Sequence, residues 1–252
     1  MGKFFTVEIK PTIPNVAAGQ HAAFGDNDLV FDWYAFDIPK GSSRLINATI
    51  EVRPKGDSGS TVNEFDIDLL FAKTVNGNAP TSAGTVNSAA FASAVNLSNH
   101  MICSISAEDW SAHEVHLDST AFTQLKQTLD GNGVFTGEPD SGTNVGYDRF
   151  YVAGIAAGAF NFVSGCLINN GDLNGPVMTV DGVDPRLFLA VGDTIAVTTT
   201  ADTAVAKDMG VIESMADANT ITLESAFTTG DVVDGDFVYN TAPIRLQLHF
   251  EK

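Results

Sequence analysis

Regular alternation of apolar and polar residues is the feature of this sequence that most limits its fold. Residues 4–13, FFTVEIKPTI, place Phe5, Val7 and Ile9 at every second position, with polar side chains between them. Successive side chains of a β-strand point to opposite faces, so this period of two predicts a strand with one buried face. The pattern returns in residues 44–53, with Ile46, Ala48, Ile50 and Val52, and in residues 64–73, with Phe65, Ile67, Leu69 and Phe71.

The remaining sequence up to about residue 170 adds strands and one helix to this pattern. Residues 28–38, DLVFDWYAFDI, are apolar on both faces and predict a central strand. Residues 39–43 and 54–60 are turn-forming clusters rich in Pro, Gly and Ser. A short helix is expected at 118–133, with Asp118 or Ser119 as N-cap and Phe122, Leu125 and Leu129 at helical spacing.

The region from residue 177 to 240 has a different character. After residue 176 the apolar runs become short, at 187–193, 194–200, 209–215, 219–225 and 236–240, and positive charge nearly disappears. Short strands between frequent turns predict a small antiparallel barrel or subsheet. Pro243 then interrupts the chain, and IRLQLHFEK restores the longer alternation of the N-terminal half.

These patterns predict an all-β protein: an antiparallel, jelly-roll-like β-sandwich with a small inserted barrel or subsheet and at most one short helix. The sandwich is expected to comprise residues 1–170 and 243–252, and the inserted module residues 177–240. The last strand then joins the sheet of the first strands, which brings the two termini close together.

The charge of the chain argues against some partners. Thirteen Lys and Arg against 31 Asp and Glu give 13 − 31 = −18. Nucleic-acid binding needs a basic stripe, so nucleic acid is not an expected partner. The apolar stretch 150–168 is interrupted by Asn161, Ser164 and several glycines, so two buried strands are expected there and not a membrane span. The first residues predict no signal peptide, and Cys103 and Cys166 are expected as buried thiols without a disulfide.

Two short motifs suggest catalysis but have simpler explanations. GDSGS at 56–60 resembles the nucleophile loop of chymotrypsin-like proteases, yet only His21 precedes Ser58, and a hairpin turn explains the same residues. HEVH at 113–116 suggests zinc, but His113 and His116 would point to opposite faces of a strand. No catalytic, cofactor-binding or metal-binding residue is therefore assigned.

Acidic residues offer the remaining candidate sites. Asp66 and Asp68 share one face of a predicted strand, an arrangement that a divalent ion or the carboxylate pair of a glycosidase could use, although the polar face of an amphipathic strand already explains them. The loops 169–175, NNGDLNG, and 231–236, with Asp231, Asp234 and Asp236, contain oxygen ligands suited to calcium but lack the EF-hand spacing.

Aromatic composition and one long polar stretch bear on binding. Seventeen Phe against 4 Tyr and 2 Trp favour cores and apolar interfaces over sugar-binding platforms. Trp33 and Trp110 are the candidates for a ligand site, with core burial as the simpler expectation. Residues 74–99 lack periodicity, which is typical of a loop that is functional or ordered by a neighbour.

The segments 31–53, 64–73 and 189–226 together resemble virion structural proteins of tailed bacteriophages, particularly marine phages, and most closely capsid decoration or accessory proteins. The shared features are Gly-Asp turns, an Asp-Ala-Asn corner and Thr-rich strands. The resemblance implies a non-enzymatic β-sandwich that needs no cofactor. It also implies an oligomer, with a trimer as the expected state, bound to the major capsid protein or other virion proteins.

This resemblance implies that the protein assembles in the host cytoplasm and then resides in the virion. Its acidity favours the outer surface of the shell over the DNA-facing interior. The alternatives are a tail or neck component or a glycan-binding receptor-binding protein of the same virion, and a hydrolase that uses Asp66 and Asp68.

Overall fold

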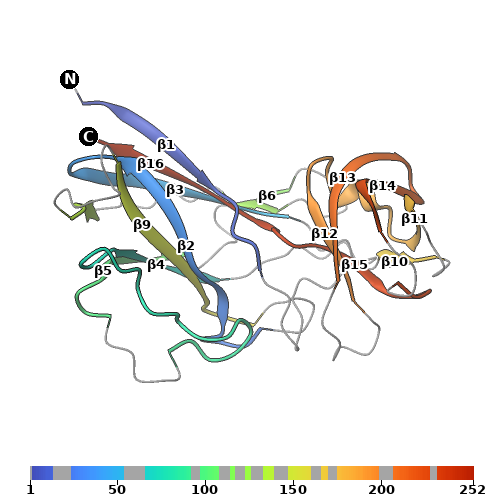
Figure 1. Ribbon diagram of the computed structural model, residues 1–252, viewed down its shortest axis with the longest axis horizontal. Coiled ribbons are helices and arrows are strands. Elements are labelled where there is room, and N and C mark those ends of the chain that lie inside the picture. Colours follow the sequence, from blue (N-terminus) through green and yellow to red (C-terminus); the bar gives the residue numbers. More distant parts are fainter. Residues whose placement is uncertain are drawn as a thin grey trace.

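The structure is a computed structural model that describes residues 2–13, 24–53, 66–91, 97–107, 114–116, 123–125, 133–138, 147–159, 166–169, 175–198, 207–227 and 232–252. In these residues every pair of neighbouring strands is antiparallel. Two sheets form a sandwich at one end of the molecule, and a small barrel lies at the other end (Figure 1). The predicted all-β class, with antiparallel sheets and a small barrel, is confirmed.

The first sheet holds both ends of the chain. Its order is β1 (Phe4–Ile9), β16 (Ile244–Glu251), β3 (Ser43–Val52), β7 (Thr123–Leu125) and β6 (Glu114–His116), and β8 (Val134–Phe135) also pairs with β3. The expectation that the last strand joins the first strands is confirmed, because β16 pairs with both β1 and β3. Strand β7 corrects the predicted helix: Thr123–Leu125 are extended, and the rest of 118–132 lies outside the described residues.

The second sheet has the order β2 (Leu29–Pro39), β9 (Tyr147–Ala156), β4 (Ile67–Lys73) and β5 (Met101–Ala107). The predicted central position of the β2 segment is wrong, because β2 is at the end of this order. The loop that follows β4 instead bonds to the free edge at the start of β2. The amide of Leu29 donates to Ser88 O, the amide of Asn87 donates to Leu29 O, and the amide of Ala83 donates to the Asp32 carboxylate.

One apolar core fills the space between the two sheets. It combines the inward faces of β1, β3 and β16 with those of β2, β4 and β9. Phe135 of the short strand β8 lies at its centre, with its ring 5.2 Å from the rings of Phe150 and Phe250 and 5.5 Å from that of Phe71. The alternation predicted for β4 is confirmed at Ile67, Leu69 and Phe71, which are fully buried, while Phe65 lies outside the described residues.

A β-bulge corrects the predicted inward face of β3. Ala48, Ile50 and Val52 are buried as expected, but Ile46 is only half-buried and Leu45 is buried in its place. The register with β16 shifts between His249 and Phe250, so β3 contributes one extra residue at this point. An extra residue in one strand reverses which side chains face the core.

The barrel is closed in the order β10 (Cys166–Ile168), β11 (Gly175–Gly182), β14 (Thr220–Phe227), β13 (Lys207–Asp217), β12 (Thr194–Thr198) and β15 (Phe237–Asn240). It encloses a separate apolar core, which includes Met178, Ile212, Leu223 and Val238. The strand expected at 187–193 is wrong: a 3-10 turn, η2 (Pro185–Leu187), is followed there by turns that bury Phe188 and Leu189. The residue boundaries expected for the sandwich and the inserted module stay predictions.

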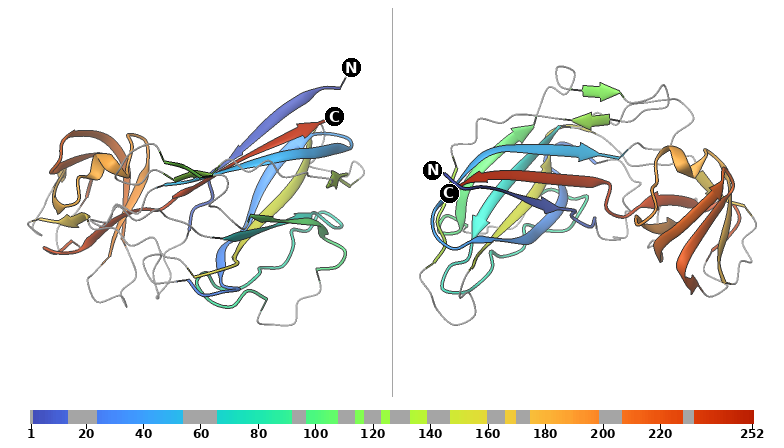
Figure 2. Two further views of the ribbon diagram at one scale, coloured as in Figure 1. Left: turned by 180° about the vertical axis from the view of Figure 1, so that it is seen from behind. Right: turned by 90° about the horizontal axis from the view of Figure 1, so that it is seen from above.

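The barrel is inserted between the two halves of the sandwich sequence. The chain leaves the sandwich after β9, builds the barrel, and returns through Thr241–Pro243 into β16. Figure 2 shows the resulting arrangement from two further sides, with both termini at the end of the molecule that is remote from the barrel. The apolar stretch 150–168 accordingly contains most of β9, in the sandwich, and all of β10, in the barrel.

Candidate binding surface at the tip of the sandwich

The end of the sandwich that holds both termini carries a groove of about 540 Å³, lined by Lys3, Phe4, Phe5, Pro39 and Lys252. We call it the tip groove. Backbone pairing produces it: the amide of Lys252 donates to Lys3 O at 2.9 Å, and the amide of Lys3 donates to Lys252 O at 3.3 Å. The first and last described residues therefore end side by side, next to the end of β2.

Phe4 and Phe5 have opposite roles in this groove. Phe5 faces inward and stacks on Phe250, with 5.3 Å between ring centroids and 14° between the ring planes. Phe4 faces outward and is 71% exposed. A single exposed apolar side chain is common on protein surfaces, but one that lies beside other exposed apolar surface is typical of a contact site. Pro39 supplies that neighbouring apolar surface for Phe4.

The outward faces of β1 and β16 are otherwise polar. The strand register aligns Phe4 with Glu251 and Arg44, and Thr6 with His249, whose Nδ1 lies 2.9 Å from Thr6 Oγ1. Phe4 therefore interrupts a solvated face at its end. An apolar side chain in this position indicates a contact surface.

Basic side chains surround the tip groove in a protein whose net charge is −18. Lys3 and Lys252 line it, and Lys252 Nζ donates to the carbonyl of Lys40. Arg44 pairs with Glu251 at 2.9 Å. Arg44 and Glu251 offset each other, so the two lysines that line the tip groove, Lys3 and Lys252, make it locally positive.

A second ion pair, formed by Arg149 and Asp37, lies at the same end of the sandwich and adds no net charge there. The Arg149 guanidinium donates two hydrogen bonds to Asp37, at 2.9 and 3.0 Å. These bonds raise the pKa of Arg149 above its usual range. The nearby Asp148 carboxylate is buried and accepts from the amide of Gly41 at 3.0 Å, so it does not face the solvent.

An ion-pair cluster occupies the junction between sandwich and barrel. Arg245 pairs with Glu8 and, at 3.2 Å, with Glu51, while Arg53 pairs with Asp193 of the barrel at 3.3 Å. The hydrogen bond from Arg245 holds the pKa of Glu8 below its usual value. A polar cavity of about 50 Å³ lies among these residues. Cations and carboxylates alternate here, so the cluster joins the two parts of the molecule and presents no excess of either charge.

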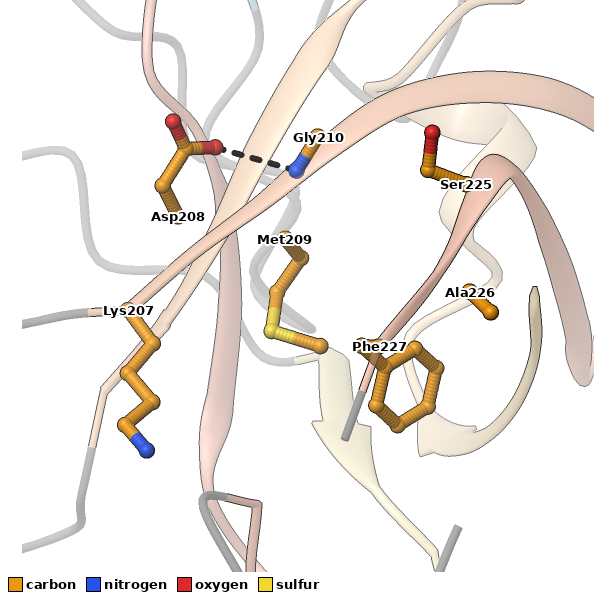
Figure 3. Close-up of a pocket in the computed structure, with 7 residues that line it drawn as sticks. All are labelled: Lys207, Asp208, Met209, Gly210, Ser225, Ala226 and Phe227. Carbon is orange, nitrogen blue, oxygen red and sulfur yellow. Dashed lines mark hydrogen bonds between the residues drawn. The ribbon is translucent and has the colours of Figure 1, made fainter. Parts of the chain in front are cut away.

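The barrel has a shallow pocket of about 360 Å³ between the start of β13 and the end of β14 (Figure 3). Met209, which is buried, and Phe227, which is half-buried, supply its apolar surface. Gly210 has a φ of +92°, a left-handed conformation that favours glycine, and its amide donates to Asp208 at 3.0 Å. The pocket could hold a small apolar group beside the charged side chains of Lys207 and Asp208.

The carboxylate pair predicted from the sequence has the predicted orientation. Asp66 and Asp68 are half-buried, while Ile67 and Leu69 between and beyond them point into the core. Asp68 is opposite Ser106 and Ile155 in the sheet, which are not acid–base partners. No group of three or more His, Cys, Asp or Glu side chains that could hold a metal occurs in the described part of the chain.

The predicted calcium ligands are placed only in part. Asp236 is 3% exposed, and its carboxylate accepts from the amide of Val233 at 2.8 Å, so it closes its own turn. Burial raises the pKa of Asp236, which is opposite to the effect of a bound cation. Asp234 is exposed on the same turn, whereas Asp231 and residues 170–174 lie outside the described residues.

Several further predicted residues cannot be placed. His21, Ser58, Trp110 and His113 lie outside the described residues, as does the whole GDSGS segment. His116 belongs to strand β6, where its backbone pairs with Thr123.

Trp33 does not belong to the sandwich core, contrary to the simpler expectation. It is half-buried on β2, and its Nε1 donates to the carbonyl of Thr81 at 2.9 Å. The adjacent Tyr34 is 39% exposed. Trp33 therefore helps to attach the loop after β4 to β2 of the same chain.

The two cysteines are thiols, as predicted. Cys166 is buried and Cys103 is half-buried, which corrects the expectation that both are buried. Burial raises the pKa of Cys103 to about 11 and that of Cys166 to about 12. Both thiols therefore stay protonated at neutral pH, which makes them poor nucleophiles.

The tip groove was not predicted from the sequence. Its residues come from positions 3–5, 39 and 252, and only the pairing of β1 with β16 brings them together. One signal was available: in the doublet Phe4-Phe5 the first Phe is out of phase with the alternation of Phe5, Val7 and Ile9.

Comparison with known proteins adds no assignment. No protein-family model matches the chain, and no curated protein is significantly similar to it. In the part of the chain that the structure describes, no helix has the length and apolar character needed to span a membrane.

Proposed function

We propose that the protein is a non-enzymatic structural component of a bacteriophage virion, a decoration protein that binds the outer surface of the head as an oligomer. The resemblance of residues 31–53, 64–73 and 189–226 to phage virion proteins supports the virion. The tip groove supports attachment through protein–protein contacts. It is an open apolar and basic surface of the kind that contacts another protein.

The charge distribution agrees with an outer position. An overall charge of −18 disfavours a place beside packaged DNA. A decoration protein is present in many identical copies, so modest contacts made by each copy add up to stable attachment without a deep pocket.

Co-sedimentation with empty heads tests this proposal. Heads of the phage that carries the gene, prepared without this protein, are mixed with the purified chain and pelleted. Saturable binding in a fixed ratio to the major capsid protein is expected, and the same assay with isolated tails is the control. Binding to tails alone, or to neither particle, would contradict a decoration role.

A receptor-binding part of the same virion is the second candidate, and the half-buried Trp33 next to the exposed Tyr34 favours it. Aromatic side chains with an accessible face stack on sugar rings. A glycan array probed with the purified protein and with its Trp33→Ala variant tests this candidate. Binding that depends on Trp33, together with binding to tails, would replace the decoration role.

A further inference from the structure

The charge of this protein is divided between its two ends. Residues 166–240, which build the barrel, contain 12 Asp and Glu and 2 Lys and Arg, a balance of 2 − 12 = −10. The tip groove at the opposite end is lined by Lys3 and Lys252, and the neighbouring Arg44 pairs with Glu251. Figure 1 shows the two ends separated by the length of the molecule.

The acidic side chains of the barrel are accessible. Glu213 and Asp217 on β13, Glu224 on β14, Asp181 on β11 and Asp208 are all exposed. The barrel also exposes apolar side chains, since Val177 is 46%, Val191 64% and Val233 57% exposed. The barrel surface therefore offers carboxylates together with small apolar groups, which is the complement of lysines together with Phe4 and Pro39.

We infer that the tip groove of one copy binds the acidic barrel of a second copy. This contact joins different surfaces of the two partners, so repetition of it builds either a closed ring or an open chain. It rests on the proposed function, because it supplies the contact for the oligomer proposed above. A ring of three copies joined in this way would form the expected trimer.

Screening makes the contact compatible with two chains that each have a net charge of −18. At physiological salt the Debye length is about 8 Å, so repulsion between distant parts of the two copies is largely screened. Opposite charges in direct contact at the tip groove are screened much less. Burial of Phe4 and Pro39 against the barrel adds an apolar contribution that salt does not screen.

Zero-length cross-linking tests the contact directly. A carbodiimide joins a lysine amine to a carboxylate only when the two groups touch. Unlabelled and ¹⁵N-labelled protein are mixed, cross-linked and digested, and mass spectrometry identifies the mixed-isotope pairs, which come from two different copies. Links from Lys3 or Lys252 to barrel carboxylates are expected; mixed-isotope links confined to sandwich residues, or none at all, would overturn the inference.

Charge reversal provides an independent test by sedimentation velocity. The tip variant Lys3→Glu with Lys252→Glu, and the barrel variant Glu213→Lys with Glu224→Lys, should each associate at least about tenfold more weakly than the wild type. Mixing the two variants should restore one contact, because the barrel variant keeps the wild-type tip groove and the tip variant keeps the wild-type barrel. Two variants that associate as tightly as the wild type, or a mixture that restores nothing, would count against the contact.

A matched control separates local from overall charge. The variant Arg186→Glu with Lys207→Glu changes the net charge by the same amount as the tip variant but acts on the barrel. It should associate at least as tightly as the wild type, and weakening equal to that of the tip variant would show that only net charge matters and overturn the inference. Thermal melts of all variants establish that each is folded.

The head-binding assay distinguishes the two proposals. A protein that binds heads but forms no cross-links between tip and barrel contradicts this inference and leaves the decoration role standing. A protein that forms these cross-links but ignores heads contradicts the decoration role and leaves the contact standing.

Discussion

Phe135 shows how much of the sandwich depends on a single side chain. It belongs to a strand of two residues, yet its ring packs against aromatic rings of β4, β9 and β16, so it connects the two sheets. Core packing is dense, and the neighbours of a deleted ring relax only in part. Very short strands can therefore contribute more stability than their length suggests.

We predict that Phe135→Ala lowers the free energy of unfolding of the sandwich by about 3–5 kcal/mol. The adjacent Val134 is 58% exposed, so Val134→Ala should change it by less than about 0.5 kcal/mol. Urea denaturation followed by tyrosine and tryptophan fluorescence measures both. Equal effects of the two substitutions would contradict the assigned orientation of β8.

The buried carboxyl group of Asp236 makes the stability of the barrel depend on pH. Burial raises its pKa in the folded state, so the folded protein binds the proton more tightly than the unfolded chain. Stability from this group is therefore greatest below the ordinary aspartate pKa of about 3.9 and falls as the pH rises through the raised value.

Asp236→Asn should remove this dependence, because asparagine is neutral and its carbonyl can still accept from the amide of Val233. The variant is expected to melt at a higher temperature than the wild type at pH 7, with the difference vanishing near pH 3. Melting temperatures over this range provide the measurement. A variant that is less stable at pH 7 would mean that the charged carboxylate itself stabilises the turn.

At the scale of elements, β16 carries the organisation of the first sheet. It pairs with β1 on one side and β3 on the other, and Ile244, Leu246, Leu248 and Phe250 are fully buried on its inner face. Its period of two was readable from the sequence, as were β1, β4 and most of β3. The bulge at Ile46 was not, because Leu45 and Ile46 are both apolar and alternation alone does not say which of them faces the core.

The failed predictions have a common physical cause. The helix expected at 118–133 and the strand expected at 187–193 rest on local propensity, which tertiary pairing overrides, as β7 shows by joining β3. The central position expected for β2 rested on apolar residues on both of its faces, but Tyr34 is exposed and a loop, not a strand, bonds to the start of its free edge. The tip groove escaped prediction because its residues meet only after β1 and β16 have paired.

We predict that Leu248→Ala lowers the free energy of unfolding by about 2–5 kcal/mol, because its side chain is fully buried. Gln247→Ala, one residue away on the solvent face, should cost less than about 1 kcal/mol. Urea midpoints of the two variants give the comparison. A larger loss of stability from the Gln247 substitution than from the Leu248 substitution would mean that the side chains of β16 are assigned to the wrong faces.

At the scale of the whole molecule, two apolar cores lie on either side of a polar junction. The sandwich core and the barrel core share no residue, and the junction between them contains hydrogen bonds such as Thr241 N to Thr194 O and the ion pair of Arg53 with Asp193. Polar contacts of this kind couple two parts less strongly than a continuous apolar core does.

Differential scanning calorimetry should accordingly resolve two transitions. Leu223→Ala removes a buried side chain of the barrel and should lower the temperature of one transition while the other stays within about 1–2 °C. A single transition that shifts as a whole would show that the junction couples the two cores into one cooperative unit.

The pairing of the two chain ends also sets how this protein bears mechanical load. A force applied between the N- and C-termini would peel β1 from β16 one hydrogen bond at a time, starting at the pair formed by Lys3 and Lys252. A force applied between the tip and the barrel would instead run along β16 and load its ladders with β1 and β3 together. The molecule should therefore unfold at low force when it is pulled by its two termini and only at higher force when it is stretched along its length. The second direction is the one in which contacts with neighbouring copies would pull.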